Sequence, residues 1–150
     1  MSPERRYAEQ AGLVLTSMGM PAAYGKLMGW LLICDPPAQS GAEISAALGL
    51  SKGSVSGGLR MLETAGLIHR VAMPGRRGIF FRMAPDALMK ATGSEKFTQF
   101  RELMDHGLEV IGGRDAPGAE RLRETRDFYA YIEVELPKLI ERYHRERGGR

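Results

Sequence analysis

The chain has 150 residues, 43% of them apolar and 26% charged, which is typical of a globular protein and excludes a disordered one. Its single cysteine, Cys34, excludes an intrachain disulfide framework and is typical of a reducing compartment. The most apolar segment, 27–34, is far too short to cross a bilayer, and the first residues lack the long apolar run of a signal peptide. We therefore expect a cytoplasmic protein without a membrane partner.

The net charge is only +3, but the positive charge is concentrated in one segment. Residues 1–51 and residues 83–150 each have a net charge of −1, whereas residues 52–82 carry six basic side chains and one acidic side chain, a net charge of +5. A polyanion would be attracted to this segment and to little else. The alternative is a solvated basic hairpin that has no partner.

Two helices are predicted in the first 34 residues. The first spans about 4–18, where apolar residues recur at helical spacing: Tyr7, Ala11, Val14, Leu15 and Met18. The second begins near Pro21 and ends before Pro36, because proline disfavours helical geometry in the residue before it. Its apolar surface is broad, so we expect this helix to be mostly buried.

Residues 40–64 predict a helix-turn-helix. Ser40 and Glu43 have the spacing of a capping box, which would start a short helix that ends near Leu48. Gly49 suits a left-handed turn, and Ser51 is placed to cap the next helix. Two helices joined by such a short glycine-containing turn form a helix-turn-helix.

The second helix of this pair has two distinct faces. The predicted core stripe consists of Val55, Leu59 and Leu62. The opposite face is small and polar with one long basic group, and it consists of Gly53, Gly57, Arg60 and Thr64, flanked by Ser54 and Ser56. Each interior glycine costs a helix ~1 kcal/mol relative to alanine. At Gly57 we expect close approach of the backbone to DNA, and Gly58 either does the same or relieves crowding against a neighbouring helix.

After Gly66 the pattern changes to period two and predicts a hairpin. On one face we expect Leu67, Val71 and Met73 to meet Ile79, Phe81 and Met83, with Arg70 and Arg82 pointing outward. The turn at 74–78 carries Arg76 and Arg77 at its tip, where arginine can bind phosphate or enter the minor groove. The alternative is a charged tip that only prevents edge-to-edge strand pairing.

These motifs carry a family resemblance. The chain resembles the winged helix-turn-helix of MarR-type transcriptional regulators, most of all the GbsR-like branch, in Ser-Lys-Gly-Ser-Val-Ser (51–56), Leu-Arg-Met-Leu (59–62), Gly-Leu-Ile (66–68) and Gly-Arg-Arg-Gly (75–78). The resemblance implies a dimeric regulator that binds DNA, often under the control of a small molecule. It also implies groove contacts by Ser54, Ser56 and Arg60 and wing contacts by Arg76 and Arg77. Gly57 and Gly58 stand where larger side chains are expected, so base readout would rest on fewer groups.

The predicted fold is mainly α with a small β-hairpin wing, in three segments. Residues 1–20 form an N-terminal dimerisation helix, 21–86 the winged helix-turn-helix and 87–150 a helical dimerisation region. Helical spacing predicts one helix from Ser94 that stops at Gly112, and a last helix with a possible kink at Pro137. A two-fold dimer would hold two recognition helices about 34 Å apart. The alternative is that these helices fold back on their own domain.

The sequence thus predicts a sequence-specific regulator of transcription, expected to be a repressor, that binds double-stranded DNA as a homodimer. The predicted DNA-binding residues are Ser51, Lys52, Ser54, Ser56, Gly57, Arg60, Arg76 and Arg77. Tyr24 and Trp30 are candidates for lining the cavity of a small-molecule effector, although as core aromatic residues they need no such role. We expect no cofactor, catalytic residue or metal site. The rival function is a winged helix that docks an acidic protein.

Overall fold

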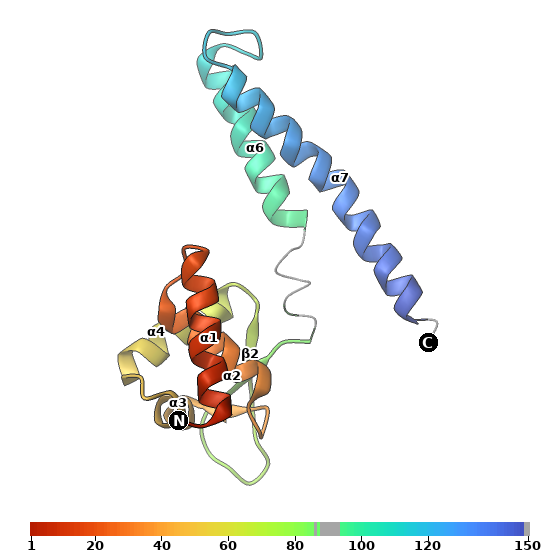
Figure 1. Ribbon diagram of the computed structural model, residues 1–150. Coiled ribbons are helices and arrows are strands. Elements are labelled where there is room, and N and C mark those ends of the chain that lie inside the picture. The colour runs from red at the N-terminus through yellow and green to blue at the C-terminus, as the bar shows by residue number, and fades with distance from the viewer. Residues whose placement is uncertain (86, 88–93, 149–150) are drawn as a thin grey trace. The chain divides into compact units, whose positions relative to one another are not determined.

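The computed structural model describes residues 1–85, 87 and 94–148, which divide into two compact units, 1–91 and 92–150 (Figure 1). The described part of the first unit contains the helices α1 (Pro3–Ser17), α2 (Ala22–Ile33), α3 (Gly41–Leu48) and α4 (Lys52–Thr64), and a small sheet. The second contains α6 (Ser94–Ile111) and α7 (Glu120–Gly148). The predicted fold class, mainly helical with a small β-hairpin, is confirmed.

The sheet has three antiparallel strands, β1 (Gln39–Ser40), β2 (Ile68–Val71) and β3 (Phe80–Met83), in the order β1-β3-β2. The predicted hairpin is β2 and β3, whereas the short β1 has no counterpart in the prediction.

The predicted hairpin faces are wrong by one residue. Val71 lies opposite Phe80 and Arg70 opposite Phe81, and directly opposed residues share a face of an antiparallel pair. Phe81 therefore shares its face with Arg70 rather than with Val71. Because Phe80 and Phe81 are adjacent, the period-two pattern alone does not tell which of them faces the core. Strand pairing selects the phase in which Phe80 is buried, and Ile79 remains 51% exposed.

The signals predicted to delimit α3 and α4 are confirmed. The Ser40 hydroxyl accepts a hydrogen bond from the Glu43 amide at 3.2 Å, and Gly49 ends α3 with a φ of 65°. The Ser51 hydroxyl accepts from the Ser54 amide at 3.1 Å and caps α4. These local interactions fix both ends of α3 and the start of α4.

Glycines allow α1 and α2 to pack in close backbone contact. A Cβ added to Gly25 would lie 2.8 Å from the Gly12 Cα, and one added to Gly29 would lie 2.5 Å from the Ala11 Cβ. Ala8 and Gly12 are the buried residues of α1, and of the apolar residues at helical spacing Leu15 packs against the core whereas Val14 and Met18 remain exposed. Small residues of α1, namely Ala8, Ala11 and Gly12, allow this close approach.

The second unit is a helical hairpin in which α6 and α7 lie side by side (Figure 1). Gly112 and Gly113 end α6 with φ of 106° and 111°, and the Gly113 amide donates to the Leu108 carbonyl at 2.7 Å. The Tyr129 ring of α7 contacts two α6 rings, with its centroid 5.2 Å from that of Phe100 and 6.0 Å from that of Phe97. The α6 stop is confirmed, and α7 continues through Pro137.

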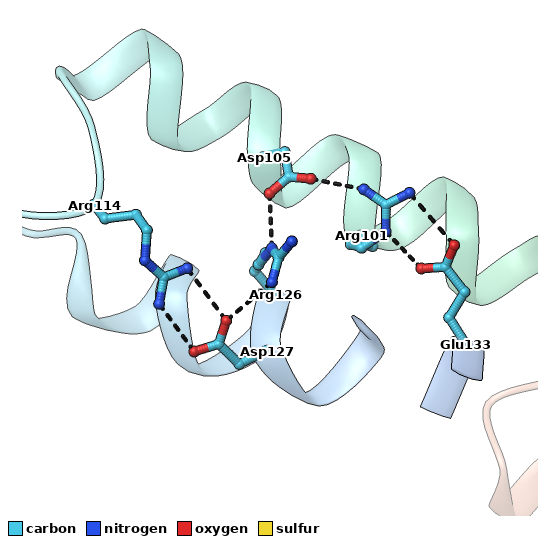
Figure 2. Close-up of polar contacts among 6 residues, drawn as sticks. All are labelled: Arg101, Asp105, Arg114, Arg126, Asp127 and Glu133. Atoms are coloured by element: carbon cyan, nitrogen blue, oxygen red, sulfur yellow. Dashed lines mark hydrogen bonds and ion pairs between the residues drawn. The ribbon is translucent and has the colours of Figure 1, made fainter. Parts of the chain in front are cut away.

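A chain of ion pairs connects the two helices of this hairpin (Figure 2). Arg101 of α6 pairs with Asp105 on its own helix and with Glu133 of α7. Asp105 also accepts a hydrogen bond from Arg126 at 2.9 Å. Arg126 forms a second ion pair with Asp127, and Asp127 pairs with Arg114. These hydrogen bonds hold the pKa values of three carboxyl groups below their ordinary range: Asp105, Asp127 and Glu133.

Large apolar side chains nevertheless remain exposed on both helices of the hairpin. The most exposed are Leu103 (57%), Val110 (71%), Phe128 (59%), Tyr131 (65%) and Val134 (56%). None of the helices in the described parts of the chain combines the length and the apolar character that spanning a bilayer requires.

Candidate nucleic-acid interface

Helix α4 presents the two faces that its sequence predicts. Val55, Leu59 and Leu62 are at most 4% exposed and pack in the core. The other face carries the predicted groove contacts, and its exposed members are Lys52, Gly53, Ser54, Ser56 and Arg60. Since the first unit places nothing within 4 Å of a Cβ added at Gly57, that position is open for an approaching partner.

The N-terminus of α4 is ordered by its serines. The Ser51 hydroxyl accepts from the Ser54 amide and also lies 3.0 Å from the Ser54 hydroxyl. These two residues, both predicted to contact DNA, are therefore hydrogen bonded to each other. Backbone amides at a helix N-terminus attract anions such as phosphate. Lys52, the first residue of the helix, adds a full positive charge at the same end.

A groove of about 330 Å³ runs along one side of α4. Its floor includes Val55, Leu59 and Phe81, and its rim carries Lys52 and Arg60. The first turn of α3 closes one side through Gly41 and Ala42. Polar and basic groups of α4 thus lie beside an apolar depression between α3, α4 and the sheet.

Two acidic side chains neutralise part of the basic segment. Glu63 of α4 accepts from Arg70 of β2 at 2.8 Å and 3.4 Å, and this hydrogen bonding raises the pKa of the Arg70 guanidinium. Glu43 of α3 pairs with Arg76 at the tip of the wing. Four cations of residues 52–82 make no ion pair with any described residue: Lys52, Arg60, Arg77 and Arg82.

The wing, residues 72–79 between β2 and β3, turns sharply at Pro74 and Gly75. The Arg76 amide donates to the Met73 carbonyl at 3.1 Å, and Gly75 has a φ of 74°. Proline followed by a glycine with positive φ is typical of a type II turn. The turn presents Arg76 and Arg77 next to each other, and both are exposed.

The acidic partner of Arg76 is not predictable from the sequence. The sequence gives Glu43 a role only in the capping box, yet its single side-chain hydrogen bond within the described residues goes to Arg76. The two residues are 33 positions apart, so no local pattern connects them. Only the opposite charges of the two side chains are visible in the sequence.

The two aromatic residues proposed for an effector cavity lie within the first unit. Tyr24 is 7% exposed, and burial raises the pKa of its hydroxyl. The Trp30 indole donates to the side-chain oxygen of the buried Gln39 at 2.7 Å, which connects α2 to β1. Each has a packing or hydrogen-bonding role there, and an effector site at these residues stays a prediction.

Comparisons with known proteins show which family the chain belongs to. A family model described as "MmpR5-like MarR family transcriptional regulator" matches residues 87–146. The chain is 36% identical over 146 residues to the HTH-type transcriptional regulator MmpR5 of Mycobacterium tuberculosis, covering 95% of this chain and 87% of that protein. It also resembles a crystal structure of a transcriptional regulator, with 36% identity and a TM-score of 0.84 over 96% of this chain and 99% of that one. Such proteins are regulators rather than enzymes, and the GbsR-like branch stays a prediction. The chain belongs to the MmpR5-like MarR family of transcriptional regulators.

Proposed function

We propose that this protein binds duplex DNA sequence-specifically as a homodimer in the cytoplasm and represses transcription. The observation that carries the proposal is the exposed face of α4, where Arg60 stands without an acidic partner among the described residues beside the open Gly57. A helix of this kind fits the major groove, where arginine binds guanine in a bidentate manner.

In this proposal the groups at the start of α4 bind the phosphates that flank the groove. Ser51 and Lys52 lie at the helix N-terminus, and Ser54, Ser56 and Arg60 face the bases. The wing, with Arg76 and Arg77 at its tip, lies beside the DNA backbone next to that groove. Phosphate contacts would set affinity and register, and the α4 side chains would set sequence preference.

A homodimer is supported by the apolar side chains that a single chain leaves exposed on α1, α6 and α7. Two copies related by a two-fold axis would present two α4 helices to half-sites one helical turn apart, roughly 34 Å. The operator is then expected to be an inverted repeat. A small-molecule effector would act by changing that separation.

Replacement of Arg60 tests the proposal. DNA that binds the protein is selected from a random duplex pool, and affinities are measured by fluorescence anisotropy. Arg60→Ala is expected to cost ~1–3 kcal/mol and to relax the preference at one base position of each half-site. Arg145→Ala removes an exposed arginine of α7 and is the control that should leave binding unchanged. If the wild-type protein selects no sequence, or if Arg60→Ala leaves the preference intact, the assignment of this face is wrong.

A further inference from the structure

The two arginines at the wing tip are neighbours in sequence but have different surroundings. The Arg76 side chain donates from Nη2 to Oε1 of Glu43, and its guanidinium carbon lies 4.6 Å from the centre of the Phe80 ring. The Arg77 side chain is exposed and forms no ion pair within the described residues. One cation is therefore engaged by the protein, and the other is available to a partner.

Both groups that hold Arg76 are themselves fixed. Phe80 is 1% exposed and paired on both sides in the sheet, opposite Ser40 of β1 and Val71 of β2. Glu43 lies in the first turn of α3, where its amide donates to the Ser40 hydroxyl. Its negative charge is favourable near the N-terminus of a helix. The guanidinium therefore connects the tip of the wing to a helix of the helix-turn-helix.

We propose that Glu43 and Arg76 form a strut that positions the wing against α3, and that Arg77 is the wing residue that binds DNA phosphate. Arg76 is then a positioning residue whose side chain stays on Glu43 in the DNA complex. The proposal deepens the function proposed above and rests on it, because it divides the wing's role between two residues.

The charges explain why Arg77 is the better phosphate ligand. If Arg76 moved to a phosphate, it would leave the Glu43 carboxylate unpaired close to a polyanion, so the exchange would gain little. A contact from Arg77 breaks no ion pair. Glu43 lies in the same first turn of α3 as Gly41 and Ala42, which line the groove beside α4. Loss of the strut would let the wing move relative to α4, and ordering it again on binding would reduce affinity.

The number of phosphates that the protein neutralises distinguishes the two roles. On B-DNA, the slope of log K against log salt concentration decreases in magnitude by about 0.9 for each phosphate that is no longer neutralised. A positioning residue lowers affinity without changing this slope. The experiment compares the wild type with four variants of the full chain, Arg77→Gln, Arg76→Gln, Glu43→Ala and the Glu43→Ala/Arg76→Gln double variant, on a selected duplex from about 50 to 200 mM salt.

We expect Arg77→Gln to lower the magnitude of the slope by about 0.9. Arg76→Gln should reduce affinity roughly threefold to tenfold at an unchanged slope. Glu43→Ala, which frees the Arg76 cation, should not lower the slope, and the double variant should bind about as well as Arg76→Gln alone. The proposal is overturned if Arg76→Gln lowers the slope as Arg77→Gln does and if the affinity losses of Arg76→Gln and Glu43→Ala add up in the double variant. An unchanged slope for Arg77→Gln overturns it too.

A second measurement needs no DNA and separates this proposal from the function it rests on. Amide hydrogen exchange of the wing should quicken in Arg76→Gln and in Glu43→Ala to the same extent, and not in Arg77→Gln. Equal exchange in the wild type and these three variants would contradict the strut even if DNA binding is normal. If the wild type binds no duplex while the wing amides respond as expected, the proposed function and the role of Arg77 fail, and the strut stands.

Discussion

Gly57 and Gly58 show how two identical residues acquire opposite roles from their surroundings. A Cβ added to Gly58 would lie 2.1 Å from Cδ1 of Leu27, a side chain of α2 that is wholly buried. A Cβ added to Gly57 would meet nothing within 4 Å. The predicted role of Gly58 in relieving crowding is therefore confirmed, whereas close approach of Gly57 to DNA stays a prediction.

Alanine at each position is expected to separate folding from binding. Gly57→Ala should stabilise α4 by ~1 kcal/mol, which raises the Tm by roughly 2–4 °C, and should weaken DNA binding because the new methyl group faces the groove. Gly58→Ala should lower the Tm, because displacing Leu27 in a packed core costs ~1–3 kcal/mol. Thermal unfolding and anisotropy titrations measure both effects. Unchanged DNA affinity in Gly57→Ala would remove the case for close approach there.

At the scale of the elements, prediction succeeded where the deciding interaction is local. Ser40, Gly49 and Ser51 delimit α3 and α4 through contacts within a few residues, and their sequence signals are specific. The phase of the hairpin depends on how β3 pairs with β2, such as Phe80 with Val71, and the existence of β1 depends on pairing across about forty residues, such as Ser40 with Phe80. The exposed face of α4 was predictable from its period, but the partners of Arg70 and Arg76 were not.

The ion pairs of the α6–α7 hairpin predict a dependence of stability on pH. The hydrogen bond from Arg101 holds the pKa of Glu133 below its ordinary value. A lowered pKa in the folded state means that the pair stabilises the fold above the unfolded pKa, about 4.3, and that this contribution is lost as the pH falls through the folded value. The stabilisation should therefore be complete at neutral pH and disappear in the acid range.

Glu133→Gln tests this dependence by thermal unfolding followed by circular dichroism. At pH 7 the variant should melt below the wild type, and the difference should shrink as the pH falls below about 4. Glu141→Gln, an exposed carboxylate of α7 without an ion pair in the described structure, should melt like the wild type throughout. A difference that persists undiminished in acid would mean that Glu133 acts through packing rather than charge.

For the whole molecule, the exposed apolar side chains of the hairpin argue for a second copy. Tyr131 is 65% exposed, so its replacement should leave the single chain folded. Tyr131→Asp is expected to convert the dimer to monomer in light scattering after size-exclusion chromatography, because a charge at a dry interface is costly. His144→Asp adds the same charge farther along α7 and should remain dimeric. A wild type that is already monomeric at micromolar concentration would contradict the dimer itself.

The close contact between α1 and α2 at Gly12, Gly25 and Gly29 has a genetic consequence. Any residue other than glycine at Gly25 or Gly29 places an atom within 3 Å of the α1 backbone or of Ala11, so both positions tolerate no side chain without separating the helices. Most single-nucleotide changes in a glycine codon alter the residue. Screens for cells that have lost regulation should therefore recover many alleles far from the DNA-facing surface. Such alleles would act by reducing the amount of folded regulator, and a higher expression level would compensate for them, which it would not do for an allele that removes a base-reading side chain.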